Sequence, residues 1–537
     1  MKNGLRIFII ILAVFTVASC ASTMRSLKPA TADPAAMAKA NYHYIIAVEA
    51  QIARDYDEAL KHLRLALDED SESLHLKTEI MKLYVRMDNA ERAIEMGEEL
   101  LREDPDNEIV LEIVARLYAA HQDNPRAISA YERLIKVSPD NTKPYIHLAY
   151  IYELEDMIDE SANTLNQVLE IDPANVMARY YLGRIYVKIK DYEKAVIHLE
   201  EAVSMNPALW DAYYSLGIAY EFTGANEEAM SSYLEAIRLN PQNSDARKRL
   251  SSLYLKSESL EDALSQLTEV LKVEPGNMEI RKLLANIYAD VEQYDRSVQE
   301  FLRVLETEPE DTNALFMLAK VYGLMDRYED AIGMFRKLEN LMPDHSGVQI
   351  HFGKLYFQHK EYQKATEKFE RALEIEPASD EIFFLLALVY EKVKDYETMG
   401  GYLQDVLRIN PNHIQALNYL GYSYADRGIN LDEALALIRR AVELDPDSGY
   451  IRDSLGWVYY KQGMYDNALH ELKRASELES DDPVIYEHLG DVYMKLQNYG
   501  EARAAWEKSL HYIKNGDDLR ERVGNKIKEL KIEGINP

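Results

Sequence analysis

The sequence predicts an all-α fold, a solenoid of about fourteen helical hairpins that ends in a capping helix. A series of prolines recurs at one constant interval from Pro105, Pro139 and Pro173 onward to Pro411, and Pro446 follows one position late. Between these prolines, apolar residues keep the spacing of one helix face over two separate stretches. A fixed period of this kind indicates repeats that bury their core against each other, so the 537 residues need not divide into globular domains.

The clearest copy of the repeat runs from Trp210 to Pro241. Its first half predicts a helix whose apolar face is formed by Tyr213, Leu216, Gly217 and Tyr220. Thr223 and Gly224 end this helix, and Asn226 offers a side-chain cap for the next one. The second helix has its own apolar stripe, formed by Ala229, Tyr233, Ala236 and Ile237. The stretch is therefore expected to be a helical hairpin.

This pattern reads W/Y-x2-L-G-x2-Y, then A-x3-Y, then P, and it resembles the tetratricopeptide repeat, whose unit is about 34 residues long. The resemblance implies a right-handed superhelical solenoid whose first helices line a concave groove. Repeats are expected over residues 40–516, with starts at 40, 74, 108, 142, 176, 210, 244, 278, 312, 346, 380, 414, 449 and 483. The last two starts are shifted because residues 426–431 contain one extra residue.

One second helix is predicted to be weak, because Gly400 and Gly401 lie inside it. Glycine costs up to about 1 kcal/mol relative to alanine in a helix interior. Either a local bend follows there, or neighbouring repeats hold the helix in place.

Residues 1–19 are predicted to be a signal peptide. Lys2 and Arg6 precede an apolar run from Ile7 to Val17, which is shorter than the roughly 20 residues that cross a bilayer. The sequence Val-Ala-Ser-Cys that ends at Cys20 resembles the lipobox of bacterial lipoproteins. In that family the cysteine is diacylated on sulfur, cleavage occurs just before it, and its new amino group is acylated. The resemblance implies a mature protein that begins at lipidated Cys20; the alternative is an ordinary secretory signal with a chance cysteine.

Residues 20–39 are expected to be the lipidated N-terminus and a flexible tether. They are rich in Ala, Ser, Thr and Pro and show no helical period before Pro34. Several acyl chains together make a stable anchor. Ala21 follows the cysteine, whereas the usual inner-membrane retention signal of Gram-negative lipoproteins is an aspartate there. The resemblance therefore implies the bacterial outer membrane, with the repeats facing the periplasm.

Residues 517–537 are expected to form a capping helix and a tail. The helix is predicted over residues 517–532 by an apolar stripe that consists of Leu519, Val523, Ile527 and Leu530. Its charged residues, which are expected to face water, are Arg520, Glu521, Arg522, Lys526, Lys528 and Lys531. A solenoid needs such an end, because an uncapped last repeat would expose its stacking face. The alternative is a basic helix that binds a partner.

The composition argues against several classes of function. With 61 basic and 92 acidic side chains, the formal net charge is −31, which repels phosphates and argues against a general nucleic-acid role. The one cysteine permits no intramolecular disulfide. No GxSxG, HExxH or glycine-rich phosphate loop occurs, so we expect no enzyme, no catalytic residue, no cofactor and no small-molecule substrate. No metal site is expected either, since His345, His351 and His359 do not share a helix face.

Recognition is then expected in the groove that the tetratricopeptide resemblance implies. In that family, positions 2, 5, 9, 12 and 13 of each unit point into the groove. Carried over to this sequence, they select aromatic and basic residues that include Tyr150, Lys188, Lys320, Lys354 and Tyr450. From this selection, the predicted partner-binding groove consists of Tyr180, Arg184, Tyr214, Phe222, Phe316, Phe357, Phe384, Tyr422, Trp457, Tyr460 and Lys461. Aromatic rings bury a large area at low entropic cost, and the cations can pair with acidic groups of a peptide. The alternative is that these rings pack on neighbouring helices.

These expectations favour a membrane-anchored scaffold or adaptor that binds protein or peptide partners in the bacterial cell envelope. Residues 414–461 look like the C-terminal repeats of long bacterial outer-membrane lipoproteins, some of which bring a carboxyl-terminal processing protease to cell-wall hydrolases. Other lipoproteins of this design serve type IV pilus assembly or exopolysaccharide export, which is one alternative. A structural oligomer whose groove is filled by its own neighbour is another, and an unusual cell-wall or glycan enzyme is a third.

Overall fold

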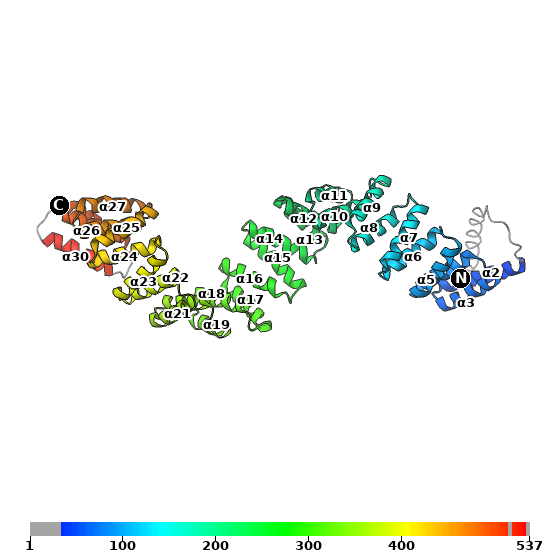
Figure 1. Ribbon diagram of the computed structural model, residues 1–537, viewed down its shortest axis with the longest axis horizontal. Helices are drawn as coiled ribbons and strands as arrows, with labels where there is room; N and C mark the ends of the chain where they lie inside the picture. The colour runs from blue at the N-terminus through cyan, green and yellow to red at the C-terminus, as the bar shows by residue number, and fades with distance from the viewer. Residues whose placement is uncertain (1–33, 514–517, 533–537) are drawn as a thin grey trace, which may run out of the picture. The chain divides into compact units, whose positions relative to one another are not determined.

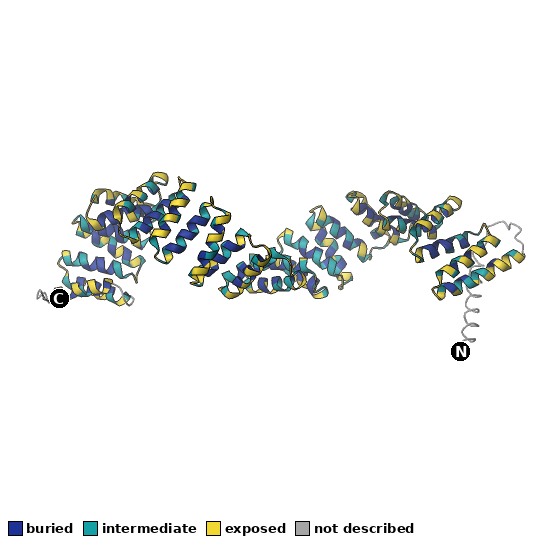
Figure 2. Ribbon diagram, turned by 90° about the horizontal axis from the view of Figure 1, so that it is seen from below, coloured by how far each residue is buried: buried dark blue, intermediate teal, exposed yellow. Residues whose placement is uncertain are grey.

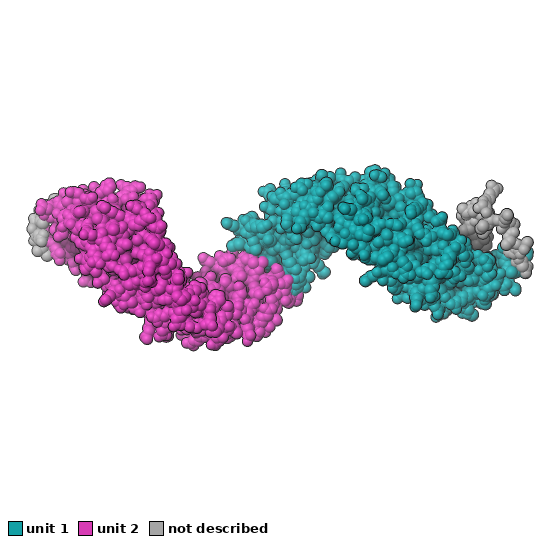
Figure 3. All heavy atoms as spheres, viewed as in Figure 1, with its two compact units in different colours: residues 1–274 teal, residues 275–537 magenta. Residues whose placement is uncertain are grey.

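The computed structural model describes residues 34–513 and 518–532, and every regular element within them is an α-helix. The 29 helices of these residues pair into fourteen hairpins and one last helix, α30 (Asp518–Ile532) (Figure 1). They belong to two compact units, Met1–Glu274 and Pro275–Pro537 (Figure 3). The predictions for the signal peptide, for Cys20 and for most of the tether fall on residues 1–33, outside the described residues.

The first unit contains seven hairpins, each made of a first and a second helix in contact. They are α2 (Pro34–Ile52) with α3 (Tyr56–Glu69), α4 (Leu74–Arg86) with α5 (Ala90–Glu103), α6 (Glu108–Ala120) with α7 (Asn124–Val137), α8 (Thr142–Leu154) with α9 (Ile158–Ile171), α10 (Val176–Lys188) with α11 (Tyr192–Met205), α12 (Trp210–Thr223) with α13 (Asn226–Leu239), and α14 (Ser244–Lys256) with α15 (Leu260–Val273).

The second unit contains the other seven hairpins and α30. The hairpins are α16 (Met278–Asp290) with α17 (Tyr294–Thr307), α18 (Thr312–Leu324) with α19 (Tyr328–Leu341), α20 (Ser346–Gln358) with α21 (Tyr362–Ile375), α22 (Asp380–Lys392) with α23 (Tyr396–Ile409), α24 (Ile414–Arg427) with α25 (Leu431–Leu444), α26 (Gly449–Lys461) with α27 (Tyr465–Leu478), and α28 (Pro483–Lys495) with α29 (Tyr499–Tyr512).

The predicted repeat starts are confirmed from the second hairpin onward. Each first helix begins at the predicted residue, including Gly449 and Pro483 after the one-residue shift. The first hairpin differs, because α2 begins at Pro34 and residues 34–39, expected to be part of the tether, are helical. Proline is favoured in the first turn of a helix, where its missing N–H would have no partner within the helix.

The turn inside a hairpin has a repeated backbone geometry. Its central residue has a positive φ, which is +84° at Gly224 and +61° at Lys360. The next residue is the N-cap of the second helix, and its side chain accepts a backbone hydrogen bond where it is Asp55, Asn89, Asp123, Asp191 or Asp395. In the hairpin of α12 and α13 this position is Ala225. Asn226 is therefore the first helical residue and not the predicted cap.

Small residues let the two helices of a hairpin approach closely, as the sequence predicts for Gly217. A Cβ atom at Gly217 would lie 2.5 Å from the ring of Tyr233. Gly353 has the same relation to Phe369. Figure 2 shows that the helices carry both buried and exposed residues along their length. The core is therefore a series of apolar stripes packed between neighbouring helices.

Two irregular stretches of the sequence, the extra residue within 426–431 and the glycines at 400 and 401, do not interrupt a helix. The extra residue lies between α24 and α25, where Gly428 has φ +65° and Asn430 has φ +45°. Helix α23 continues through Gly400 and Gly401, and Met399 beside them is buried. This arrangement agrees with the interpretation that neighbouring repeats hold the glycine-containing helix in place.

The last helix, α30, covers the end of the final hairpin as predicted. Its stripe of Leu519, Val523, Ile527 and Leu530 is buried and packs in one cluster with Ala502 and Trp506 of α29. Of all the helices described, none combines the length and the apolar character needed to cross a bilayer.

Candidate functional site

The first helices of the last three hairpins form one surface, because α26 contacts both α24 and α28. We call this surface the first-helix face. It carries four of the predicted groove residues, and it also buries three ionisable side chains: Asp453 is 7% exposed, Glu487 is 1% exposed and His488 is 4% exposed. Buried ionisable groups are costly unless they are paired, so the contacts of these three residues decide what the face can do.

Trp457 lies in the middle of a stack of rings. Its indole is nearly parallel to the ring of Tyr460, with centroids 4.8 Å apart, and to the ring of His488, with centroids 4.1 Å apart. The indole N–H donates a hydrogen bond of 3.3 Å to Oδ1 of Asp426. The ammonium of Lys461 lies 5.0 Å from the Trp457 ring centroid and donates to the carbonyl of Asp426. Trp457, which is only 9% exposed, therefore serves mainly to hold α26 against its neighbours.

His488 forms a buried ion pair with Asp453. Its Nδ1 lies 2.8 Å from Oδ1 of Asp453, and the pair links α28 to α26. Burial by itself lowers the pKa of His488, but the charges of Asp453, Glu487 and Asp491 outweigh it, so the pKa lies above its ordinary value. The structure thus favours the charged imidazolium at this position.

Two acidic residues of α28 hold two basic residues of α30. Arg522 donates two hydrogen bonds of 2.6 Å to the carboxylate of Glu487. Lys526 donates to Glu487 at 2.8 Å and to Asp491 at 2.6 Å. Burial works against the charged form of Glu487, but the hydrogen bonds from Arg522 and Lys526 bring its pKa below the ordinary value. The side chain of Arg522 is 58% exposed, as expected for a residue that faces water, and it still pairs with Glu487. The side chain of Lys526, which was also expected to face water, is only 25% exposed, because the buried Glu487 needs cationic partners.

A hollow of about 490 Å³ opens on the first-helix face and shares Asp453 with the buried ion pair. Three tyrosines and three aspartates are among its lining residues: Tyr419, Tyr422, Tyr450, Asp445, Asp453 and Asp482. We call it the carboxylate–tyrosine hollow. Tyr450 is 57% exposed and Tyr419 is 38% exposed. Burial raises the pKa of Tyr422, and the charges of Asp426, Asp453 and Glu487 raise it further.

The other predicted groove residues of the second unit contact aromatic neighbours. Phe316 meets the ring of His351 edge to face, with centroids 4.9 Å apart. Phe357 meets Tyr362 in the same way at 5.8 Å. The ring centroid of Phe384 lies 4.9 Å from that of His413 and 5.9 Å from that of Tyr419. Phe384 therefore contacts a residue that lines the carboxylate–tyrosine hollow. All three phenylalanines are partly buried.

The four predicted groove residues of the first unit differ in exposure. Tyr180 is buried at 7% exposure, and the guanidinium of Arg184 lies 5.8 Å from its ring centroid while pairing with Glu153. Tyr214 is partly buried, with its centroid 6.1 Å from that of Tyr233. Phe222 is 56% exposed and stacks on Tyr192 with centroids 4.7 Å apart. Packing on neighbours accounts for much of this set, and a partner-binding role for its members stays a prediction.

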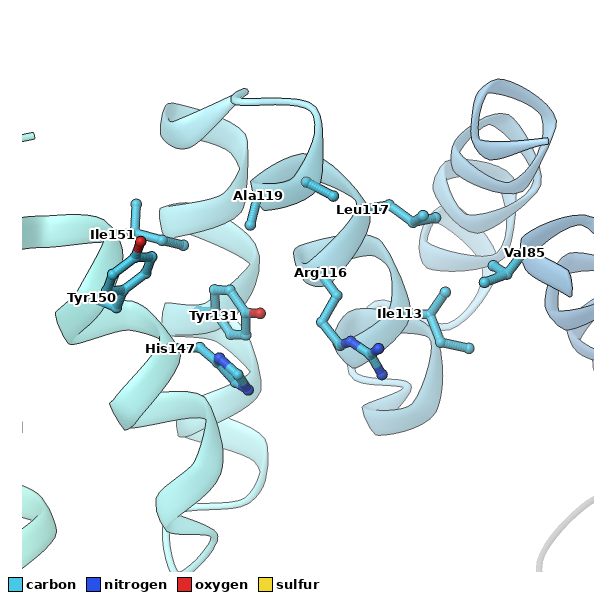
Figure 4. Close-up of a pocket in the computed structure, with 10 residues that line it drawn as sticks. Val85, Ile113, Arg116, Leu117, Ala119, Tyr131, His147, Tyr150 and Ile151 are labelled. Atoms are coloured by element: carbon cyan, nitrogen blue, oxygen red, sulfur yellow. The ribbon is translucent and has the colours of Figure 1, made fainter. Parts of the chain in front are cut away.

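The first unit has a hollow of its own, of about 430 Å³, which we call the Arg116 hollow. Figure 4 shows Arg116 between Ile113 on one side and Tyr131 and His147 on the other. Burial raises the pKa of Tyr131 to about 12. Burial also lowers the pKa of His147, and the charge of Arg116 lowers it further. The Arg116 hollow therefore contains a cation among apolar side chains, whereas the carboxylate–tyrosine hollow contains carboxylates.

Sequence reasoning missed the acidic residues of the first-helix face. Asp426, Asp453, Glu487 and Asp491 occupy the same repeat positions that selected the groove residues, but the selection kept only aromatic and basic side chains. Their repeat positions gave no distinctive signal, because acidic residues occupy groove positions in three other consecutive repeats as well, at Asp211, Asp245 and Glu279. The pairing of the missed residues with His488, Arg522 and Lys526 depends on contacts between hairpins and carries no local signal.

No group of three or more metal-ligating side chains is placed to hold a metal ion among the residues described. The three histidines considered from the sequence have separate contacts. His345 caps α20 by accepting the N–H of Val348, His351 packs on Phe316, and the ring of His359 lies 3.9 Å from that of Tyr328.

Comparisons with protein families match repeats along most of the chain. Models described as TPR repeat match residues 183–224, 353–394 and 456–497. Models described as tetratricopeptide repeat match residues 50–117, 142–175, 164–197, 223–287, 254–321, 380–413, 400–449 and 484–512. A model of anaphase-promoting complex, cyclosome, subunit 3 matches residues 300–372.

Among curated proteins, a TPR repeat-containing protein of Pseudomonas aeruginosa is 46% identical over 61 residues. The aligned segment spans 11% of this chain and 10% of that relative.

Three solved structures illustrate the likeness in fold. YrrB, described as a TPR protein with an unusual peptide-binding site, is 23% identical with a TM-score of 0.32 and covers 35% of this chain and 97% of its own. The Cut9–Hcn1 hetero-tetramer is 16% identical with a TM-score of 0.37 and covers 84% and 95%. A tetratricopeptide repeat protein from Parabacteroides merdae is 16% identical with a TM-score of 0.35 and covers 46% and 98%.

Proposed function

Because the chain belongs to the tetratricopeptide repeat family, we propose that it is a protein-binding scaffold which a lipid anchor holds at the bacterial outer membrane, facing the periplasm. Repeats of this family imply a protein–protein interaction scaffold. The anchor, the location in the envelope and the choice of the first-helix face as the binding surface are the finer parts of the proposal.

The carboxylate–tyrosine hollow is the observation that carries the choice of binding surface. Tyr419 and Tyr450 leave much of their rings exposed at a place where the surrounding helices are tightly packed. Exposed tyrosines beside a recess are typical of binding hot spots, because a partner can bury them at little cost in side-chain entropy.

The buried contacts of the first-helix face support binding without large rearrangement. The Trp457 stack joins α24, α26 and α28, and the pairs formed by Glu487 fix α30 against α28. A face that is rigid before binding loses less entropy when a partner docks. In the proposed mechanism, an extended segment of the partner lies along this face, and no bond in it is made or broken.

The lipid anchor rests on the sequence around Cys20. An apolar run followed by Val-Ala-Ser-Cys supports lipidation. We expect Cys20→Ala to move the protein from the membrane fraction to the soluble periplasm, while a Ser22→Ala control stays with membranes. Persistence of the Cys20→Ala protein in washed membranes would refute lipidation as the anchor.

The binding surface is tested by capture of partners with the whole chain. Tagged protein is crosslinked in its own cell envelope and purified, and the partner set of wild type is compared with that of the double variant Tyr419→Ala/Tyr450→Ala. We expect the double variant to lose at least one partner. Tyr396→Ala is the matched control, since Tyr396 is 39% exposed in the same unit but begins a second helix, α23. Trp457→Ala is less suitable, because Trp457 is packed in the stack.

An unchanged partner set in the double variant would remove the first-helix face as the binding surface. Loss of partners in Tyr396→Ala alone would move the surface to the second helices.

A further inference from the structure

The first-helix face already binds cations contributed by the chain itself. Glu487 and Asp491 of α28 hold the side chains of Arg522 and Lys526, which project from α30. Two charged groups on successive turns of one helix are thus recognised by carboxylates of a first helix. The contacts show which kind of side chain this surface accepts, and the same surface continues onto α26 and α24.

The carboxylate–tyrosine hollow repeats this chemistry, but of its three lining carboxylates only Asp453 has a cation of the chain beside it, the imidazolium of His488. No lysine, arginine or histidine is among the described residues that line it. Two of its three carboxylates use Oδ1 in hydrogen bonds, Asp453 with His488 and Asp482 with the backbone N–H groups that begin α28. Asn418 lines the hollow as well, and within the described part of the chain its buried Oδ1 accepts no hydrogen bond. The hollow therefore presents acceptors that lack donors.

The electric field around the hollow also favours a cation. Tyr450 lines the hollow, and the carboxylate of Glu479 raises the pKa of the Tyr450 hydroxyl. Burial and the charges of Asp482 and Asp481 raise this pKa further. A ring with exposed faces among carboxylates attracts an ammonium or guanidinium group through cation–π and charge interactions together. An acidic or phosphorylated segment would be repelled at the same place.

We propose that the carboxylate–tyrosine hollow binds a lysine or arginine side chain from an extended basic segment of a protein partner. This proposal rests on the proposed function, because it names the chemistry of the partner that the scaffold binds. The cation's N–H groups bond to Asp445 and Asp453, and its aliphatic stem packs on Tyr419 and Tyr450. The segment continues from there along the first-helix face.

Peptide binding to the whole chain tests the proposal. The probes are fluorescein-labelled peptides of four Ser-Leu-Lys units or four Ser-Leu-Glu units, and fluorescence anisotropy measures their affinity. We expect the lysine probe to bind and the glutamate probe not to bind. Because the chain has a net charge of −31, general attraction must be separated from binding in the hollow.

Two pairs of variants make this separation. Asp445→Asn and Asp447→Asn each remove one negative charge, but only Asp445 lines the hollow, whereas Asp447 is exposed nearby in the same turn. Tyr450→Ala removes an exposed ring of the hollow, and Tyr396→Ala removes an exposed ring elsewhere in the same unit. We expect Asp445→Asn and Tyr450→Ala each to weaken the lysine probe about two- to fivefold, and the two controls to leave its affinity unchanged.

Equal weakening by Asp445→Asn and Asp447→Asn would overturn the proposal, as would failure of the lysine probe to bind. If either result occurred while Tyr419→Ala/Tyr450→Ala still lost a partner in the envelope, only the basic chemistry of that partner would be refuted. If the double variant kept all partners, the proposed binding surface itself would be refuted.

Discussion

Glycine has opposite effects on stability at two positions of the second unit. A Cβ at Gly353 would lie 2.5 Å from the ring of Phe369, whereas nothing lies within 4 Å of a Cβ at Gly401. We expect Gly353→Ala to lower the free energy of unfolding by about 1–3 kcal/mol, because it overpacks the core. Gly401→Ala should raise it by up to about 1 kcal/mol, because alanine favours the helix. Urea unfolding of both variants measures the two changes, and changes of the same sign would contradict this account.

The residue pattern predicts the close packing at Gly353, and of the effect at Gly401 it predicts only the helix-propensity part. An apolar residue followed by glycine at a fixed place in the repeat identifies Gly217 and Gly353 as close-approach positions. The free space beside Gly401 depends on side chains from other helices, so no local pattern predicts it.

The charged pair of His488 and Asp453 predicts how stability depends on pH. A group whose pKa is raised by folding stabilises the folded state fully below its unfolded pKa, here an ordinary value of 6.5, and this contribution is lost as pH rises through the folded pKa. The advantage of wild type over His488→Gln in urea unfolding should therefore be larger at about pH 6 than at about pH 8. Fluorescence of Trp457, which stacks on His488, follows the transition.

His351 is the matched control, because burial lowers its pKa. Its stabilising contribution is present above its unfolded pKa and is lost as pH falls, so His351→Gln should change the pH dependence in the opposite sense. The same sense of change in both variants would show that the His488 pair is not the cause.

Trp457 shows why single residues of the site were hard to assign from sequence. Its repeat position predicts a place on the first-helix face, and the structure puts it there. Its ring, however, is covered by His488, which belongs to the next hairpin along the chain. Whether a groove position is free for a partner depends on such contacts between hairpins.

Helix α30 depends on charge pairs as well as on its apolar stripe. The side chain of Glu487 is 2% exposed and has two cationic partners on α30. We expect Glu487→Gln to weaken the docking of α30 by about 1–3 kcal/mol, because Arg522 loses its anionic partner and Lys526 keeps only Asp491. Faster hydrogen exchange of the amides of residues 518–532 would report this change.

The control for α30 is Glu477→Gln, which removes an exposed pair with Arg474 on α27 and should leave the exchange of α30 unchanged. The lowered pKa of Glu487 gives a second check. Its contribution is present above the ordinary value of 4.5 and is lost as pH falls through the folded pKa, so α30 should dock less firmly at acid pH. Unchanged exchange in Glu487→Gln would leave the apolar stripe as the main attachment.

The repeat period predicts where the first helices begin more closely than it predicts how individual helices are capped. Thirteen of the fourteen first helices begin at the predicted residue, because each start is fixed by the period. The exceptions lie where local chemistry competes with the period. Pro34 allows α2 to begin early, and Ala225 occupies the cap position that Asn226 was expected to fill.

The two units each have their own buried clusters, so damage in one should remain local. Leu63 in the first unit and Leu472 in the second are both fully buried. Leu63→Ala should cost about 2–5 kcal/mol and should speed hydrogen exchange mainly in nearby hairpins of the first unit. Leu472→Ala should do the same in the second unit. Exchange that rose uniformly over both units in either variant would contradict a nearest-neighbour description of this repeat protein.

The repeat that identifies the fold says little about what the whole molecule binds. Most recurring residues serve packing between helices, so the sequence predicts the array well and the binding surface only in outline. What distinguishes the last three hairpins is that acidic residues of their first helices, among them Asp453 and Glu487, are buried and pair with side chains of the helices that follow.

The most direct test of the central claim is photocrosslinking from the first-helix face of the whole chain in its own envelope. A benzoylphenylalanine placed at residue 450 reports on the carboxylate–tyrosine hollow, and one at residue 477 reports on the second helix α27. We predict that residue 450 crosslinks to a partner segment rich in lysine or arginine and that residue 477 does not. Crosslinks to the same partner from residue 477 alone, or from both positions equally, would contradict the claim.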